Sequence, residues 1–311
     1  MYVYGPVPSR RLGRSLGVSP IPPKVCSYTC VYCQLGRTTR LQMKRESFFP
    51  KEDILAEIVS KAPKDKTDYV TFVGDGEPTL NNDLGWLIQS TKEKLQLPVA
   101  VITNGSLLSQ EKVREDLSRA DVVIPTLDAG NDKTFRAVNR PHRRIDYDTM
   151  LQGLVDFQRR YSGQVWVEVM LVKDLNDSER ELQSIKQAVD MIAPDRVYVL
   201  TPIRPPAERW VKPPNPETIL RAQEILGEAT LVSGLETGQF GLGEFSDAGQ
   251  AILEIGSRHP LRSEQAAEIE RTFSESGVVR HMLETKELVN IIYNGEDYLL
   301  PGHFAMGKQT P

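Results

Sequence analysis

The stretch YVTFVGDGEPTL, from Tyr69 to Leu80, shows the unit that recurs along this chain. It opens with β-branched and aromatic residues, which predict a strand, and the DGEP that follows is typical of a turn. Similar strand-like runs recur along the chain, with amphipathic helical stretches between them. This alternation is typical of βα units around a parallel sheet, in which ligands bind at the carboxyl ends of the strands.

The same pattern predicts how large the sheet is. The predicted strands are SLGVSPI (15–21), YVTFVG (69–74), VAVIT (99–103), DVVIPTL (121–127), VWVEVMLV (165–172) and RVYVLT (196–201). Helical periodicity marks stretches such as KEDILAEIVSKA (51–62), SQEKVREDLSRA (109–120), YDTMLQGLVDFQRRY (147–161) and SERELQSIKQAVDMI (178–192). Six strands are too few for a closed eight-stranded barrel, so we expect an open, partial (β/α)6 barrel of the α/β class.

The chain has three cysteines, and all of them lie in CSYTCVYC, residues 26–33. An odd number of crowded cysteines does not fit a secreted disulfide framework and indicates a metal or redox site in a reducing compartment. A closed zinc site needs a fourth ligand, and the nearest histidine in sequence is the distant His142. In a [4Fe–4S] cluster, three thiolates leave one iron open to a ligand that is not protein.

With Tyr32 just before its third cysteine, this loop resembles the cluster motif of the radical SAM superfamily. The resemblance implies a radical SAM barrel with one [4Fe–4S] cluster on Cys26, Cys30 and Cys33, and S-adenosylmethionine (SAM) on the open iron. It implies reductive cleavage of SAM to methionine and a 5′-deoxyadenosyl radical that abstracts hydrogen from the substrate. It also implies a low-potential electron donor, a flavodoxin or ferredoxin.

The glycine-rich turn is the next element of the resemblance. Gly74, Gly76, Glu77 and Pro78 resemble the family's GGEP stretch, which holds the SAM amino group, although Asp75 stands where a glycine is usual. A positive ammonium group requires acceptors, and glycine lets the backbone approach closely. The alternative is an ordinary βα turn without a ligand.

Polar residues also follow the next two predicted strands. Asn104, in ITNGSLL, stands where the family contacts SAM, although a turn-forming Asn-Gly pair needs no ligand. Asp128, in PTLDAG, is expected at the same rim as a contact for ribose hydroxyls or substrate, although a helix N-cap two or three residues later could equally explain a short polar residue there. Tyr32 completes the expected cofactor contacts.

Glu168 stands in the middle of an apolar strand. Alternation places Trp166, Glu168 and Met170 on one face of VWVEVMLV, and a buried carboxylate is costly without a partner. We expect Glu168 to point into the barrel mouth towards SAM or substrate, or to form a buried salt bridge with an arginine such as Arg140. On the loop after the sixth strand, Arg204 and Arg209 are candidates to bind phosphate or carboxylate, unless they are surface arginines without a ligand.

The segments PSRRLGRSLGV (8–18), GDGEPTL and TPIRPPAERWV resemble the branch of the tRNA wyosine-base synthetases and their relatives. That resemblance implies a methylated purine in tRNA as substrate. The synthetases carry a second cluster on three further N-terminal cysteines, which this chain lacks, so pyruvate condensation is not carried over.

The chain is predicted to divide into a barrel, residues 1–245, and a winged-helix-like module, residues 246–311. The segment 246–256 is predicted as the boundary, 259–276 as a helix pair, and 278–301 as a helix followed by a hairpin that turns at Asn294-Gly295. Residues 257–311 carry six Lys or Arg and eight Asp or Glu, so we expect a protein-contact, substrate-positioning or structural role for the module rather than DNA reading.

Charge and hydropathy leave several functions open. The net charge of −4 argues against bulk nucleic-acid binding, yet residues 1–45 carry eight basic side chains and no acid, which fits either an anionic cluster or RNA phosphate. No apolar leader or membrane-length run is present, so we expect a cytoplasmic, soluble protein without membrane contact. The hypotheses are a radical SAM enzyme for a nucleoside in RNA, an activase or modifier of a protein or peptide, and a cluster-based redox sensor.

Overall fold

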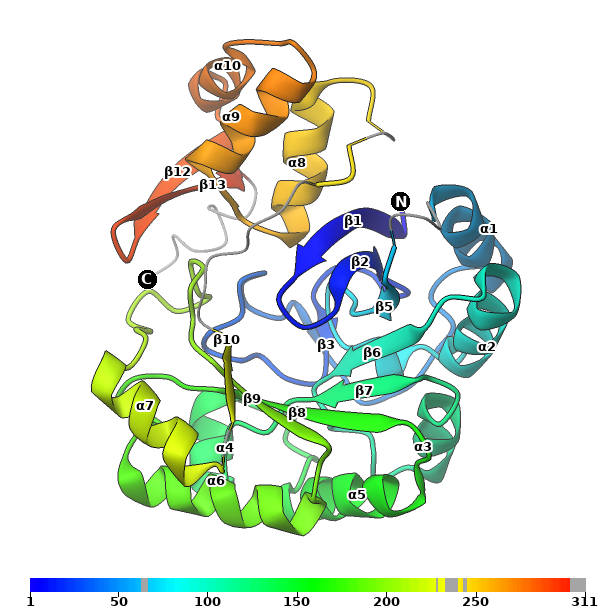
Figure 1. Cartoon of the computed structure of the whole chain (residues 1–311), viewed down its shortest axis with the longest axis vertical. Coiled ribbons are helices and arrows are strands. Elements are labelled where there is room, and N and C mark those ends of the chain that lie inside the picture. Colours follow the sequence, from blue (N-terminus) through cyan, green and yellow to red (C-terminus); the bar gives the residue numbers. More distant parts are fainter. Residues whose placement is uncertain (63–66, 228, 233–239, 243–244, 303–311) are drawn as a thin grey trace.

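The computed structural model describes residues 1–62, 67–227, 229–232, 240–242 and 245–302. An eight-stranded sheet in the order β1-β2-β5-β6-β7-β8-β9-β10 forms its centre (Figure 1). From β2 to β10 all neighbours pair in parallel, and β1 pairs antiparallel with β2. These strands are β1 (Val3–Ser9), β2 (Gly13–Val18), β5 (Tyr69–Phe72), β6 (Val99–Thr103), β7 (Val122–Pro125), β8 (Gln164–Met170), β9 (Arg196–Leu200) and β10 (Thr230–Val232).

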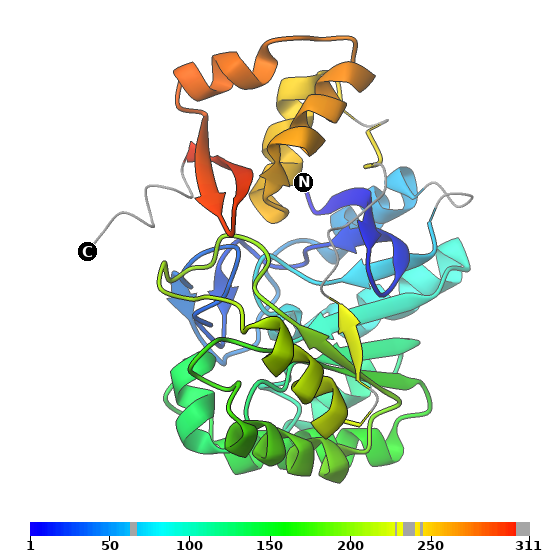
Figure 2. The ribbon, with the colours of Figure 1, turned by 60° about the vertical axis from the view of Figure 1, so that its left-hand side comes forward.

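Helices cover the outer face of this curled sheet (Figures 1 and 2). They are α1 (Lys51–Lys61), α2 (Leu84–Leu95), α3 (Glu111–Leu117), α4 (Asp132–Val138), α5 (Tyr147–Arg160), α6 (Glu179–Ile192) and α7 (Pro216–Ile225). The alternation predicted for β8 is confirmed. Val165, Val167 and Val169 pack in the main core with the helices, whereas Trp166 and Met170 pack in a separate apolar cluster with residues of the neighbouring strands.

The six predicted strands are confirmed as β2 and β5 to β9, and the partial barrel with them. Two edge strands were not predicted. β1 contains Gly5, Pro6 and Pro8, which are typical of loops, and β10 has three residues, too few for a periodic pattern. No helix in the described ranges combines the length and apolar character needed to cross a membrane.

The C-terminal module lies at one end of the molecule, beside β1 (Figures 1 and 2). It consists of α8 (Ala248–Arg258), β11 (Leu261–Arg262), α9 (Ser263–Thr272), α10 (Val278–Glu284), β12 (Leu288–Tyr293) and β13 (Glu296–Pro301). Its strands form an antiparallel sheet in the order β11-β13-β12, and it has its own apolar core. The predicted hairpin turn is confirmed, because Asn294 and Gly295 have φ values of 52° and 83°.

Two expectations for this module were wrong. Segment 246–256 is not a boundary, because most of it belongs to α8, and 259–276 contains β11 and one helix instead of two. The buried residues of α8 recur at helical spacing, although the helix contains two glycines, which are poor helix formers. The division after residue 245 stays a prediction, and residues 233–239, 243–244 and 303–311 of its two parts lie outside the described residues.

Candidate functional site

The cysteine loop lies against the carboxyl ends of the parallel strands. The short parallel pair β3 (Val25–Cys26) and β4 (Arg40–Leu41) encloses it. The side-chain amide of Asn104, after β6, lies 3.6 Å from the sulfur of Cys26, and that of Asn139, after α4, lies 3.6 Å from the sulfur of Cys30. The structure therefore places the cysteine loop at the carboxyl edge of the sheet, beside Asn104, where polar contacts were predicted.

The three thiols fit an iron–sulfur cluster better than a single metal ion. They are free, and no group of three or more His, Cys, Asp or Glu side chains in the described part of the chain could hold one ion. A [4Fe–4S] cluster binds each thiolate to a different iron, so the sulfurs need not converge on one point. Burial raises the pKa of Cys26 to about 12, so its thiolate needs a cationic partner, which iron would provide.

The glycine-rich loop packs backbone against backbone on Val25 of β3. A Cβ atom on Gly76 would lie 1.9 Å from the carbonyl oxygen of Val25, and Gly74 has a φ of 62°. The N–H of Glu77 donates to that same carbonyl at 3.1 Å. Pro78 then begins the buried 3-10 turn η2 (Pro78–Leu80). The glycines at 74 and 76 thus allow the loop to lie directly beside the cysteine segment.

Glu77 is buried and ties two loops together. Its Oε1 accepts from the hydroxyls of Thr79 and Thr103, each at 2.6 Å, and from the N–H of Thr79 at 3.0 Å. Its Oε2 accepts from the N–H of Asn104 at 2.7 Å, which leaves that oxygen room for a second donor. Burial raises the pKa of the Glu77 carboxyl, and the hydrogen bonds from Thr103 and Thr79 oppose this shift.

Asp128 joins the cysteine loop to the end of β7. Its Oδ2 accepts from the hydroxyl of Tyr32 at 2.5 Å and from the side chain of Asn139 at 2.6 Å, and its Oδ1 accepts from the N–H of Met170 at 2.8 Å. Burial raises its pKa to about 6. A helix N-cap does lie three residues later, at Asn131, which caps α4, but the Asp128 carboxylate itself accepts from Tyr32, Asn139 and Met170. Asn139, which touches both Asp128 and Cys30, had no motif in the sequence to reveal it.

Glu168 forms an ion pair with Arg11, and both side chains are largely buried. The salt-bridge alternative is therefore the one that the structure contains, but with a different arginine, because Arg140 pairs instead with Glu208 at 2.6 Å. Arg11 lies on the short turn between β1 and β2, which was not predicted to approach β8. The buried charge of Glu168 is thus compensated without a bound ligand.

The arginines after β9 have different surroundings. Arg204 donates to the side chain of Gln34 at 2.8 Å and lies 3.0 Å from a ring nitrogen of His259, so it is engaged within the protein. Arg209 is exposed. Between them, the buried Glu208 accepts from Arg37 at 3.0 Å and from Arg140, and the hydrogen bond from Arg37 lowers its pKa.

Comparison with known proteins defines the class to which this arrangement belongs. Residues 21–183 match the radical SAM superfamily. The chain is 35% identical to the UPF0026 protein MJ1312 of Methanocaldococcus jannaschii, over 96% of this chain and 95% of that protein. The fold resembles a radical SAM methyltransferase from Sphaerobacter thermophilus, with a TM-score of 0.53 and 18% identity over 71% of this chain and 66% of the other.

A more distant relative is the S-adenosylmethionine-dependent nucleotide dehydratase of Flammeovirga pacifica, which is 26% identical over 55% of this chain and 60% of that protein. The chain therefore belongs to the radical SAM superfamily and, within it, to the UPF0026 proteins. It is an enzyme whose cofactors are a [4Fe–4S] cluster and SAM and which needs a reductant, and this excludes the sensor hypothesis. The chain has cysteines for one such cluster.

Proposed function

We propose that this enzyme uses SAM-derived radical chemistry on a nucleoside in RNA, in its specific form a methylated purine in tRNA. With its cofactors bound, the site would supply a radical that abstracts hydrogen from the substrate. Cys26, Cys30 and Cys33 would hold the cluster, while Tyr32, Gly74, Gly76, Glu77, Pro78, Asn104 and Asp128 would form the SAM pocket. We assign Glu168 to support of this pocket through Arg11 rather than to direct contact.

A cationic rim beside the cysteine loop carries the substrate proposal. Glu208 directly precedes residues 209–212 in the chain. Its ion pairs with Arg37 and Arg140 connect it to residues 37–41 and 140–144. We call these three segments the cationic rim, because they contain no acidic residue. The exposed basic side chains of the rim are Arg37, Arg40, Arg143, Arg144, Arg209 and Lys212.

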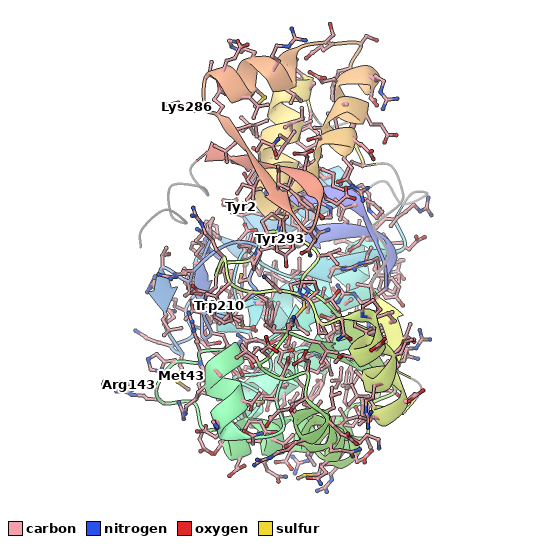
Figure 3. The ribbon with its side chains drawn as sticks, turned by 90° about the vertical axis from the view of Figure 1, so that its left-hand side faces the viewer. Tyr2, Met43, Arg143, Trp210, Lys286 and Tyr293 are labelled. Atoms are coloured by element: carbon pink, nitrogen blue, oxygen red, sulfur yellow. The ribbon has the colours of Figure 1, made fainter. Side chains whose placement is uncertain are left out.

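Trp210 adds an aromatic surface to the cationic rim. Its side chain is 50% exposed, and Figure 3 shows it on the same side of the molecule as Met43 and Arg143. Exposed aromatic rings beside basic side chains suit single-stranded nucleic acid, because bases stack on the ring and phosphates pair with the cations. A relative named for action on a nucleotide supports the same substrate class. Arg209 is exposed and directly precedes Trp210 in the chain. Arg204 instead donates a hydrogen bond to Gln34 within the protein.

The test is cleavage of SAM with and without RNA. The protein is reconstituted anaerobically, reduced with dithionite and given SAM, and 5′-deoxyadenosine is measured by chromatography with and without total tRNA. We expect tRNA to raise the yield. A yield that tRNA leaves unchanged, but that a protein or peptide raises, would contradict the RNA proposal in favour of the peptide alternative. We propose flavodoxin or ferredoxin as the natural replacement for dithionite.

Variants of the cationic rim sharpen this test. Trp210→Ala should weaken tRNA binding roughly tenfold, because stacking of one base contributes about 1–3 kcal/mol. Trp86→Ala is the matched control, since Trp86 is also exposed but lies on α2 with Lys51 over its ring. Affinity should also fall steeply with salt. Equal tRNA affinity of the Trp210 and Trp86 variants would remove the cationic rim as the binding surface.

A further inference from the structure

The C-terminal module contacts loops that surround the cysteines. From its hairpin, the hydroxyls of Tyr293 and Tyr298 donate to the carbonyls of Pro202 and Ile203, at 2.8 and 2.7 Å. From the cysteine loop, the side chain of Gln34 donates to the carbonyl of Arg258 at 3.0 Å. The module is therefore fastened to the loop after β9 and to the residue that follows Cys33.

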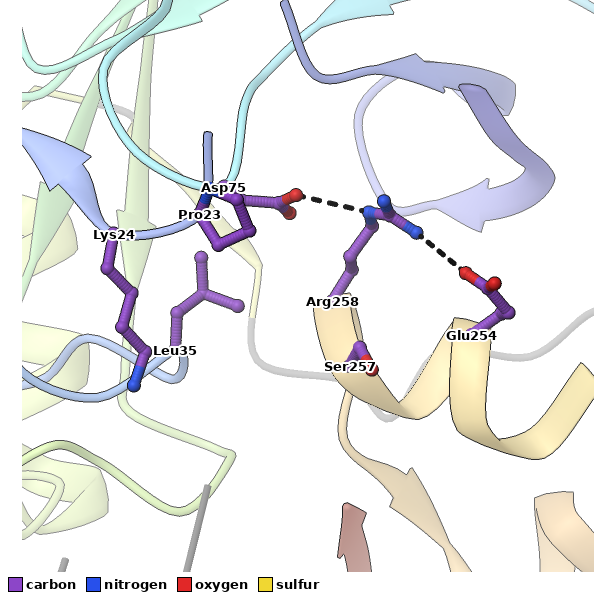
Figure 4. Close-up of a pocket in the computed structure, with 7 residues that line it drawn as sticks. All are labelled: Pro23, Lys24, Leu35, Asp75, Glu254, Ser257 and Arg258. Atoms are coloured by element: carbon purple, nitrogen blue, oxygen red, sulfur yellow. Dashed lines mark hydrogen bonds and ion pairs between the residues drawn. The ribbon is translucent and has the colours of Figure 1, made fainter. Parts of the chain in front are cut away.

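The side chain of Arg258, at the end of α8, reaches into the barrel domain (Figure 4). Its Nε lies 3.3 Å from Oδ2 of Asp75, its Nη2 donates to the carbonyl of Met1 at 3.2 Å, and its guanidinium lies 5.1 Å from the centre of the Tyr4 ring. Glu254 of the same helix lies 3.4 Å from Nη1. With 13% of its side chain exposed, Arg258 is held on several sides.

Asp75 is the residue by which the glycine-rich loop departs from the paired glycines of the family. It is 8% exposed, its N–H donates to the hydroxyl of Ser19 at 2.9 Å, and its carbonyl accepts from the N–H of Lys24 at 2.7 Å. A buried carboxylate requires a cationic partner, and Arg258 provides one. The pair therefore connects the module to the residue directly before Gly76 and Glu77.

The cysteine loop is held from the same side. Gln34 donates to the Arg258 carbonyl and accepts from Arg204 at 2.8 Å, so it bridges the module and the loop after β9. A pocket of about 200 Å³ lies between the two parts, lined by Pro23, Lys24, Leu35 and Asp75 from the barrel and by Glu254, Ser257 and Arg258 from α8. One end of α8 thus contacts both loops that the radical SAM site needs.

We propose that Arg258 is a positioning residue for the SAM site. Through Asp75 and Gln34, the C-terminal module holds the glycine-rich loop and the end of the cysteine loop in their binding arrangement, and docking of the module sets the affinity for SAM. This inference rests on the SAM chemistry of the proposed function and is independent of the RNA substrate.

The test measures SAM affinity by equilibrium dialysis on reconstituted protein with wild-type iron content and without RNA. Arg258→Gln should raise the Kd for SAM about tenfold, and Arg258→Lys should raise it less, because it keeps the charge. Arg280→Gln, an exposed arginine of the same module, is the control and should leave the Kd unchanged. In the metal-free protein, backbone hydrogen exchange of residues 74–78 should be faster in Arg258→Gln than in wild type and unchanged in Arg280→Gln.

A double-mutant cycle identifies the connection. Asp75→Asn should weaken SAM binding like Arg258→Gln, and the double variant should be no weaker than either, because both remove the same ion pair. If Arg258→Gln does not fold, the SAM affinity of Asp75→Asn tests the proposal in its place. A Kd within twofold of wild type in Asp75→Asn or folded Arg258→Gln, or fully additive losses, would overturn the proposal. Failure of the wild-type protein to bind SAM would instead contradict the radical SAM chemistry itself.

Discussion

The Oε2 atom of Glu77 lies 2.7 Å from the backbone nitrogen of Asn104 and accepts its hydrogen bond. Through this bond the loop after β5 is fastened to the loop after β6, whose Asn104 side chain in turn lies beside the sulfur of Cys26. One buried carboxylate therefore aligns two predicted SAM-binding loops with the predicted cluster ligands.

Glu77→Ala should weaken SAM binding at least tenfold while the cluster stays in place. The substitution removes a charged acceptor from several buried donors, and a hydrogen bond to a charged group contributes about 1.5–3 kcal/mol. SAM affinity and iron content are measured on the same preparation, with the exposed Glu115→Ala as control. An unchanged affinity would remove Glu77 from the site.

The Arg11–Glu168 pair should behave as a buried ion pair. Arg11→Met alone should lower the free energy of unfolding by about 3–5 kcal/mol, because it leaves the Glu168 charge without compensation. Adding Glu168→Met should restore most of this loss. Urea denaturation of the two single variants and the double variant measures the coupling, and additive losses would show that the two side chains do not act as a pair.

Glu208 should make stability depend on pH in the acidic range. Its pKa lies below the ordinary 4.5 because Arg37 and Arg140 donate to the ionised carboxylate, so the folded state binds its proton less readily than the unfolded state. The stabilisation is complete above pH 4.5 and is lost as the pH falls through the folded-state pKa.

Urea denaturation of the wild-type protein and Glu208→Gln, from pH 7 to pH 3.5, measures this contribution. The difference in the free energy of unfolding between the two proteins should be constant at neutral pH and shrink below about pH 4.5. A difference that grows on acidification would mean that the Glu208 pKa is raised instead.

Gly76→Ala should displace the glycine-rich loop. The added Cβ would meet the Val25 carbonyl at 1.9 Å, and neither backbone segment can yield without moving the loop or β3, which contains Cys26. We expect loss of both SAM binding and stable cluster incorporation. Gly256→Ala is the control, because its Cβ would meet Pro301 at an ordinary 3.5 Å. Normal SAM affinity of the Gly76 variant would show that the close packing is not required.

Local patterns predicted the sheet and the cysteine loop because both depend on short-range signals. The strands have buried β-branched runs, and the three cysteines fall within eight residues. The ion pairs Arg37–Glu208 and Asp75–Arg258 join residues 171 and 183 positions apart, and no periodicity encodes such contacts. Arg140 illustrates this limit, since it was named as an example of an arginine that could pair with Glu168 and instead pairs with Glu208.

The radical SAM assignment is tested most directly by SAM cleavage in wild-type protein and Cys30→Ala side by side. Both are reconstituted anaerobically, assayed for iron, reduced with dithionite and given SAM, and 5′-deoxyadenosine is measured. We predict deoxyadenosine from the wild-type protein, and neither the cluster nor the product from Cys30→Ala. No deoxyadenosine from wild-type protein with a verified [4Fe–4S] cluster, or full cleavage by Cys30→Ala, would contradict radical SAM chemistry at these cysteines.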